Sequence, residues 1–308
     1  MKRVAAVDCG TNSIRLLVAE LDPHTGESRD LSRRMEIVRL GQGVDRTGRL
    51  NPDALDRTLE ALRDYKKIVD DLGARSVRMV ATSATRDAEN RDAFVEGVHA
   101  ILGVDPEVIT GDEEARLSFL GATRELAGAG DAVRPYLVVD IGGGSTEFVI
   151  GGTDVTAGRS VNIGCVRLTE RHLHDDPPTP AQIEAATADI DAAIDEAAQA
   201  VPLLEAGSLL GLAGTVTTLA GIDLDLPAYD PERIHHSRIS AARVHEISGK
   251  LLAMTHAERA AIPVMHPGRV DVIGAGSLIL DRIVARVGLD DVLVSEHDIL
   301  DGMAWSLV

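Results

Sequence analysis

Two short stretches of this chain combine an acidic residue with a glycine-containing turn. Residues 8–13 read DCGTNS, and residues 140–145 repeat the pattern as DIGGGS. Each stretch lies between two apolar runs, which predicts a strand, a tight turn and a second strand. A glycine-rich turn can direct several backbone N–H groups at one anion, and an aspartate that ends a strand can hold a hydrated cation. Two copies therefore predict a clamp for a chain of phosphates.

Carboxylates beside these turns are the candidates for holding a divalent cation, Mg²⁺ or Mn²⁺. Asp140 and Asp8 end their strands, and Asp140 is the stronger candidate. Glu147, on the strand that leaves the second turn, could join that metal or position an attacking water; otherwise it is an exposed strand residue. The predicted phosphate donors are Thr11, Asn12 and Ser13 in the first turn, and Gly142, Gly143, Gly144 and Ser145 in the second.

Two arginines are the cations expected to reach phosphate, because a guanidinium can bind two phosphoryl oxygens at once. Arg86 follows small hydroxyl residues where a strand gives way to a helix. Arg15 lies on a strand whose alternation could equally aim it at solvent. Gly214 and Thr215 begin a third glycine turn before a helix, where they either border the far end of the substrate or only start the helix.

Length and composition limit the classes of function. A chain of 308 residues is long enough for two domains. Aromatic residues make up only 2% of the chain, and its formal net charge is −18. Few aromatic side chains disfavour base stacking, and the negative charge repels nucleic acid and anionic membranes. We therefore expect neither a nucleic-acid partner nor a membrane partner.

The cysteines and histidines indicate a reducing compartment and no zinc site. Only Cys9 and Cys165 are present, so a disulfide framework is not expected. The ten histidines form no HExxH pattern, which disfavours zinc. The apolar stretch after Arg3 is interrupted at Asp8, too early for a signal peptide. The sequence thus predicts a cytoplasmic protein.

Alternating strand and helix patterns predict an α/β fold. Residues 51–72 keep helical spacing behind an Asn51 N-cap, and Gly128 to Pro135 is the predicted linker. Residues 160–167 are expected to continue the second sheet. Apolar residues at the end of the chain, Trp305 and Leu307 among them, predict a terminal helix that docks by one face.

Six short stretches, spread in order over nearly the whole chain, form a recognisable set of motifs. They are residues 8–17, 81–90 (ATSATRDAEN), 111–121 (GDEEARLSFLG), 140–150 (DIGGGSTEFVI), 164–170 (GCVRLTE) and 213–220 (AGTVTTLA). Together they resemble the exopolyphosphatase / guanosine pentaphosphate phosphatase (Ppx/GppA) family, in its short two-domain, actinobacterial form. The resemblance implies a duplicated actin-like (ribonuclease-H-like) fold with an interdomain catalytic cleft. Its domains would be residues 1–125, with 299–308 packed on them, and 126–298.

The same resemblance assigns roles to two residues. Glu114 matches the second glutamate of the family's GxEEAR stretch and is the expected catalytic base, although Glu113 and Glu114 could also be ordinary first-turn acids. Arg86 matches a phosphate-contact position, so the expected catalytic residues are Glu114, Glu147 and Arg86. The chain stops at Val308, where larger members carry a further helical region, and this disfavours processive digestion of long polymers.

Several functions remain compatible with the sequence. The first is an exopolyphosphatase that prefers short inorganic polyphosphate, and the second uses guanosine pentaphosphate as substrate. A sugar or acetate kinase shares the first motif, but residues 111–116 fit the hydrolase pattern better. The last alternative is a non-catalytic polyphosphate or alarmone sensor. The resemblance is compatible with a homodimer.

Overall fold

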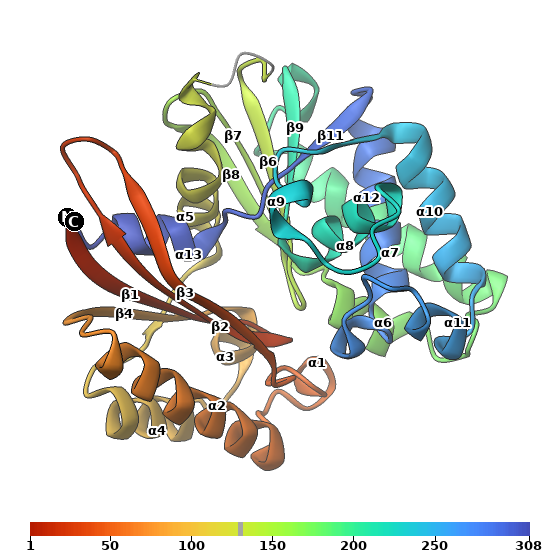
Figure 1. Cartoon of the computed structure of the whole chain (residues 1–308). Helices are drawn as coiled ribbons and strands as arrows, with labels where there is room; N and C mark the ends of the chain where they lie inside the picture. Colours follow the sequence, from red (N-terminus) through yellow and green to blue (C-terminus); the bar gives the residue numbers. More distant parts are fainter. Residues whose placement is uncertain (129–131) are drawn as a thin grey trace. The chain divides into compact units, whose positions relative to one another are not determined.

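The computed structural model describes residues 1–128 and 132–308, which form two compact units (Figure 1). Unit 1 comprises Met1–Gly121 together with Ile299–Val308, and unit 2 comprises Ala122–Asp298. The linker predicted at Gly128 to Pro135 includes residues 129–131, which lie outside the described residues. In the described parts of the chain, no helix is both long enough and apolar enough to cross a membrane.

Unit 1 is built on a five-stranded mixed sheet of order β3-β2-β1-β4-β5. The first three strands form an antiparallel meander, and β4 and β5 run parallel to β1. Residues 4–7 in the middle of β1 are completely buried, as expected for an apolar run in a sheet covered on both faces. The strands are β1 (Lys2–Cys9), β2 (Ser13–Leu21), β3 (Ser28–Ile37), β4 (Ser76–Ala81) and β5 (Glu107–Val108).

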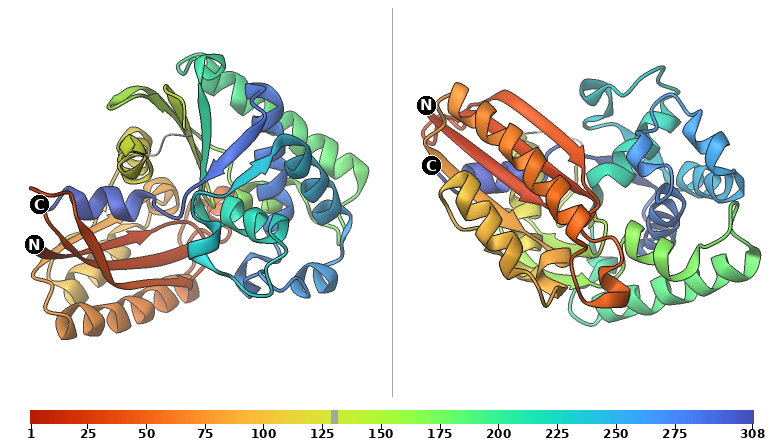
Figure 2. Two further views of the ribbon diagram at one scale, coloured as in Figure 1. Left: turned by 45° about the horizontal axis from the view of Figure 1, so that its top comes forward. Right: turned by 90° about the horizontal axis from the view of Figure 1, so that it is seen from below.

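Helices cover both faces of this sheet (Figure 2). The Asn51 side chain accepts from two amides at the start of α2, which confirms the predicted N-cap. Leu62 and Tyr65 of α2 pack on one face, and Met303 of α13 packs on the other, with Trp305 against the same cluster. The helices are α1 (Val44–Thr47), α2 (Pro52–Asp71), α3 (Ser83–Asp87), α4 (Asp92–Leu102), α5 (Gly111–Thr123) and α13 (Ile299–Trp305).

Unit 2 repeats the same topology on a six-stranded sheet. Its order, β10-β11-β9-β6-β7-β8, contains the reverse of the first sheet with one strand added at the edge. An antiparallel meander is again followed by strands parallel to its first member. The repeat confirms the predicted duplicated actin-like fold. The strands are β6 (Tyr136–Ile141), β7 (Thr146–Gly151), β8 (Val155–Val161), β9 (Ser208–Leu212), β10 (Arg238–Ser240) and β11 (Asp291–Val294).

Helices α7, α8, α10 and α12 contribute most of the core on one face of this sheet, against alternate β6 residues such as Leu137 and Val139. The helical segments are η1 (Glu125–Gly128), α6 (Cys165–His172), α7 (Pro180–Ala198), η2 (Leu203–Glu205), α8 (Ala213–Asp223), α9 (Pro231–Ile234), α10 (Ala241–Ala253), α11 (His256–Ala260), η3 (Pro267–Arg269) and α12 (Ile273–Val287).

One predicted element is wrong. Residues 160–167 were expected to continue the sheet, but β8 ends at Val161 and α6 begins at Cys165. The amides of Cys165 and Val166 donate to the carbonyls of Gly142 and Gly143 at 3.0 and 2.9 Å. These tertiary hydrogen bonds satisfy the first turn of a helix, and strand propensity alone does not reveal them.

Candidate functional site

The two predicted phosphate turns have the same backbone design. Gly10 donates its amide to the carbonyl of Ser13 at 2.9 Å, and Gly142 donates to the carbonyl of Ser145 at 3.0 Å. The flanking strands pair antiparallel, β1 with β2 and β6 with β7, which confirms the predicted strand, turn and strand. The duplication therefore extends from the sheet topology to single hydrogen bonds.

In both turns, backbone carbonyl groups accept hydrogen bonds from amides later in the chain. In the first, the carbonyl of Asn12 accepts from residues 38 and 39 at 3.1 and 2.8 Å, and that of Thr11 accepts from Gly41 at 2.8 Å. In the second, the carbonyls of Gly142 and Gly143 accept from the first turn of α6. This anchoring fixes the orientation of each peptide plane in the turn.

The opposite edges of those peptides carry amide N–H groups. Among the described residues, the amides of Thr11 and Asn12 in the first turn have no hydrogen-bond partner, and neither do those of Gly143 and Gly144 in the second. Successive N–H groups of this kind form an anion-binding nest. The backbone of each turn is thus suited to an anion such as phosphate.

The two hairpins differ in the residues that face each other across their strands. Asp8 lies opposite Arg15 in the first, whereas Asp140 lies opposite Glu147 at the equivalent register of the second. The first hairpin therefore pairs a carboxylate with a cation, and the second places two carboxylates side by side. One backbone design supports two different electrostatic roles.

The Arg15 guanidinium binds Asp8 through two nitrogens, Nη2 and Nε, at 2.6 and 3.0 Å from Oδ2. Asp8 is buried, and the Arg15 side chain is 19% exposed. Arg15 is thus turned along the hairpin, with its position fixed by the aspartate at the end of β1.

Asp140 and Glu147 are both buried, 8% and 1% exposed. The Ser160 hydroxyl donates to Oε1 of Glu147 at 2.7 Å. Carboxylate and hydroxyl oxygens are the ligands that Mg²⁺ and Mn²⁺ prefer, and two adjacent carboxylates favour a bound cation. The donor set of the second hairpin therefore fits the predicted metal, while Oδ2 of Asp8 is occupied by Arg15.

The catalytic candidates of unit 1 are linked to the first turn through α3. The Thr11 and Ser83 hydroxyls share a hydrogen bond of 2.9 Å, which attaches α3 to the turn. Later in α3, Nη1 of Arg86 donates to Oε2 of Glu114 at 3.1 Å and to the Ile109 carbonyl at 3.0 Å. The structure thus brings Arg86 and Glu114 into contact.

The neighbouring glutamates of α5 have different surroundings. Glu113 receives two hydrogen bonds of 3.0 Å from Arg116, which hold the pKa of its carboxyl below the ordinary value. Glu114 is only 8% exposed and contacts Arg86. Glu113 is therefore committed to a surface ion pair, whereas Glu114 lies inward with the Arg86 cation.

In unit 2, the predicted residues Gly214 and Thr215 lie at the start of α8. The Thr215 hydroxyl hydrogen-bonds the Cys165 thiol, and the Cys165 amide donates to the carbonyl of Gly142. This chain of contacts connects α8 to the second phosphate turn. Burial raises the pKa of the Cys165 thiol to about 11, so the thiol is neutral and serves packing.

Sequence reasoning missed Arg269. Its guanidinium lies against Gly214, where an added Cβ would be 2.3 Å from Cζ, and Nη1 donates to the Thr218 hydroxyl at 3.1 Å. A cation at the start of α8 adds to the positive end of the helix dipole. Arg269 follows a Pro-Gly turn, which is only a loop signal, and its closeness to Gly214 arises from the tertiary fold alone.

Duplicated actin-like units, each with an anion-binding turn between antiparallel strands, define a class of phosphate-handling proteins. The model of the Ppx/GppA phosphatase family matches residues 17–308, and the chain belongs to this family.

Individual relatives agree with that assignment. The chain is 49% identical to "Exopolyphosphatase 2" of Mycobacterium tuberculosis over 318 aligned residues, covering 100% of this chain and 99% of that protein. It is 28% identical to a "Guanosine-5'-triphosphate,3'-diphosphate pyrophosphatase" of Aeromonas hydrophila, covering 99% of this chain and 59% of the relative.

Solved structures give the same result. A crystal structure described as an exopolyphosphatase-like protein has 44% identity and a TM-score of 0.94, and covers 98% of each chain. The Ppx/GppA family member of Aquifex aeolicus has 31% identity and a TM-score of 0.80, over 99% of this chain and 97% of that one.

Proposed function

We propose that this protein is an exopolyphosphatase that hydrolyses the terminal phosphoanhydride bond of inorganic polyphosphate and releases orthophosphate. The observation that carries this proposal is the pair of equivalent turns, each with two amides that have no hydrogen-bond partner among the residues that the structure describes. Two anion sites of the same design suit a substrate that repeats its phosphate group. The full-length relative named exopolyphosphatase 2 supports the same substrate.

Substrate binding is assigned to the backbone of both turns. Thr11 and Asn12 would donate amides to phosphate oxygens in unit 1, with the Ser13 hydroxyl beside them, and Gly143 and Gly144 would do so in unit 2, with Ser145 beside them. Such donors match phosphate charge without a large positive surface, which suits a chain of net charge −18. Arg269 and Arg15 add guanidinium groups, with Gly214 and Thr215 at the border of the unit 2 site.

The chemical step is assigned to Glu114 and Arg86. Glu114 accepts a proton from the attacking water, and Arg86 holds the carboxylate in place through its hydrogen bond. Its guanidinium can also bind an oxygen of the phosphoryl group that is leaving the chain. The 25% exposure of the Arg86 side chain leaves it accessible to such a ligand.

A divalent metal, Mg²⁺ or Mn²⁺, would be held by Asp140 and Glu147. When bound, the ion supplies positive charge that offsets charge on the phosphoryl oxygens. Ser160 orients Glu147 by its hydrogen bond. Oδ2 of Asp8 binds Arg15, so we assign Asp8 to positioning that arginine and keep its second carboxylate oxygen as a further candidate ligand of the metal.

Guanosine pentaphosphate is the second candidate substrate, and relatives named for its hydrolysis favour it. The same turns and the same water attack would serve, with a nucleoside beside the terminal phosphates. We place the reaction in the cytoplasm, since both cysteines are buried free thiols. A sizing measurement checks whether the protein is a homodimer.

Phosphate release measured on both substrates tests the proposal. Polyphosphates of several chain lengths and guanosine pentaphosphate are compared at equal concentrations of terminal phosphate, with Mg²⁺ or Mn²⁺ present. Release from short polyphosphate with the highest kcat/KM supports the first assignment. Preference for the nucleotide supports the second, and release from neither contradicts both.

A further inference from the structure

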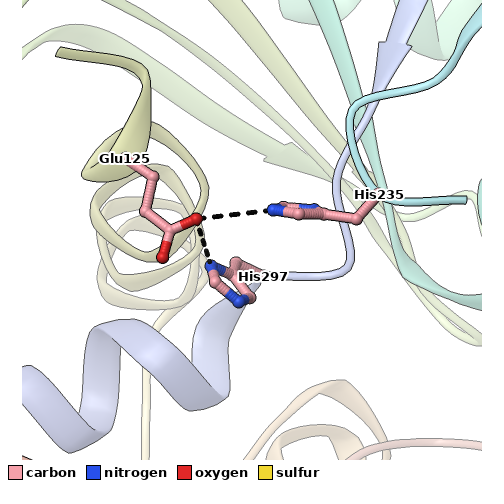
Figure 3. A group of neighbouring side chains, drawn as sticks. All are labelled: Glu125, His235 and His297. Carbon is pink, nitrogen blue, oxygen red and sulfur yellow. Dashed lines mark hydrogen bonds and ion pairs between the residues drawn. The ribbon is translucent and has the colours of Figure 1, made fainter. Parts of the chain in front are cut away.

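Two histidines and a glutamate converge in unit 2. Figure 3 shows Glu125, His235 and His297 with their polar atoms directed at one another. One oxygen of Glu125, Oε2, lies 3.4 Å from Nε2 of His235 and 3.4 Å from Nδ1 of His297. The three ligand atoms lie within 4.8 Å of one another.

These separations match metal coordination better than direct hydrogen bonding. A hydrogen bond between a charged nitrogen and a carboxylate is normally about 2.7 to 2.9 Å long. Tetrahedral coordination with bonds of about 2.0 to 2.1 Å places neighbouring ligand atoms about 3.3 to 3.4 Å apart. Both distances from Glu125 have this value, and the two histidine nitrogens, which lie within 4.8 Å of each other, come to it by rotation of their rings when an ion binds.

We propose that Glu125, His235 and His297 form a binding site for a divalent transition-metal ion of the zinc type, separate from the Mg²⁺ or Mn²⁺ assigned to the second hairpin. Two imidazoles and one carboxylate favour zinc, nickel or cobalt over magnesium. Three protein ligands leave the fourth position to water. The side chains of Glu125, His235 and His297 are 45%, 21% and 26% exposed, so an ion can reach them from solvent.

Other histidines of the chain do not share this geometry. His99, His172, His245 and His256 each contact a carboxylate, but among the described residues only the Glu125 group combines three such ligands. No sequence pattern indicates this group, because its members come from η1, the loop after α9 and the loop after β11. Tertiary folding alone brings them together.

Metal binding is coupled to a backbone change. Nδ1 of His235 accepts the amide N–H of Glu296 at 3.1 Å, so in the metal-free protein Nε2 carries the ring proton. Coordination through Nε2 moves that proton to Nδ1, and the Glu296 peptide must then turn away. Unit 2 begins at Ala122 and ends at Asp298, so the ion would tie together the two ends of this unit.

Calorimetric titration of the untagged, metal-stripped full chain with ZnCl₂ tests the site. Saturating Mg²⁺ is kept present to occupy the Asp140 and Glu147 pair. We expect one equivalent of Zn²⁺ to bind, with His297→Ala and Glu125→Gln each weakening the affinity at least about 100-fold. His245→Ala, which removes an exposed histidine that contacts Asp281, is the matched control and should leave the affinity unchanged.

Two further readouts separate the site from a folding effect or from unspecific binding. Thermal unfolding without metal should be similar for all variants, and Zn²⁺ should raise the melting temperature of the wild type but not of His297→Ala. Nitrogen-15 spectra should show the His235 ring proton moving from Nε2 to Nδ1 when Zn²⁺ binds. Zn²⁺ affinity that is equal in wild type and His297→Ala, or a His235 tautomer unchanged at saturation, would overturn the proposal.

Discussion

Replacing Gly164 by alanine should damage catalysis without removing any group that contacts substrate. A Cβ at this position would lie 2.5 Å from the carbonyl carbon and oxygen of Gly143 and 2.6 Å from the amide nitrogen of Gly144. Ordinary contacts of a Cβ begin near 3.4 Å, so the turn must move by the difference, about 0.9 Å. The φ of Gly164 is −158°, which alanine adopts without strain, so the effect is purely steric.

A displacement of this size should lower kcat about 100-fold, because catalytic groups misplaced by about 1 Å lose roughly that factor. Overpacking should also cost about 1–3 kcal/mol of stability. The control is Gly249→Ala in α10, an exposed helical position where an added Cβ meets nothing within 4 Å. That variant should keep full activity and gain about 0.5–1 kcal/mol.

Phosphate release and thermal unfolding are measured for both variants, so that a loss of kcat can be distinguished from a loss of folded protein. If Gly164→Ala stays folded and its kcat is within twofold of wild type, the geometry of the Gly142–Ser145 turn does not control the reaction. The assignment of its amides to phosphate binding would then be wrong.

Three other predictions concern the site. Glu114→Gln should lower kcat about 100- to 10,000-fold with little change in KM, because it removes the proton acceptor, whereas Glu113→Gln should leave the rate near normal in the same phosphate assay. Arg269→Met should raise KM about tenfold or more and leave the melting temperature within a few degrees, since it removes a guanidinium from the start of α8. Because burial raises the pKa of Cys165 to about 11 from an ordinary value near 9, its contribution to stability is complete below pH 9. This contribution should be lost as the pH rises toward 11. Urea unfolding at several pH values measures the free energy of unfolding, and a free energy that does not change between pH 9 and pH 11 would contradict the prediction.

Much of the fold could be predicted because local and tertiary signals agree. The apolar runs around Asp8 and Asp140 became the two antiparallel hairpins, and the Asn51 cap began α2 as expected. Residues 160–167 failed as a strand because the start of α6 is set by hydrogen bonds to Gly142 and Gly143, which no local pattern contains.

The sequence indicated site residues only where they lie in or next to a motif that could be recognised locally. The contact between Glu114 and Arg86 joins α5 to α3, and the sequence suggested the two residues but not their contact. The contact of Arg269 with Gly214 and the group of Glu125, His235 and His297 each join segments far apart in the chain, so residue spacing could not predict them. The pairing of Arg15 with Asp8 is set by strand register, which a one-residue shift would abolish.

Hydrolysis in ¹⁸O-labelled water tests the central claim most directly. Short polyphosphate is incubated with the enzyme and a divalent metal, and the released orthophosphate is analysed by mass spectrometry, with Glu114→Gln in parallel. Attack by water on the terminal phosphorus predicts one ¹⁸O atom in each orthophosphate that is cleaved from a chain end, with release nearly abolished in the variant. Release that needs an added acceptor, orthophosphate without label, or an equal rate for Glu114→Gln would contradict a hydrolase that uses this glutamate.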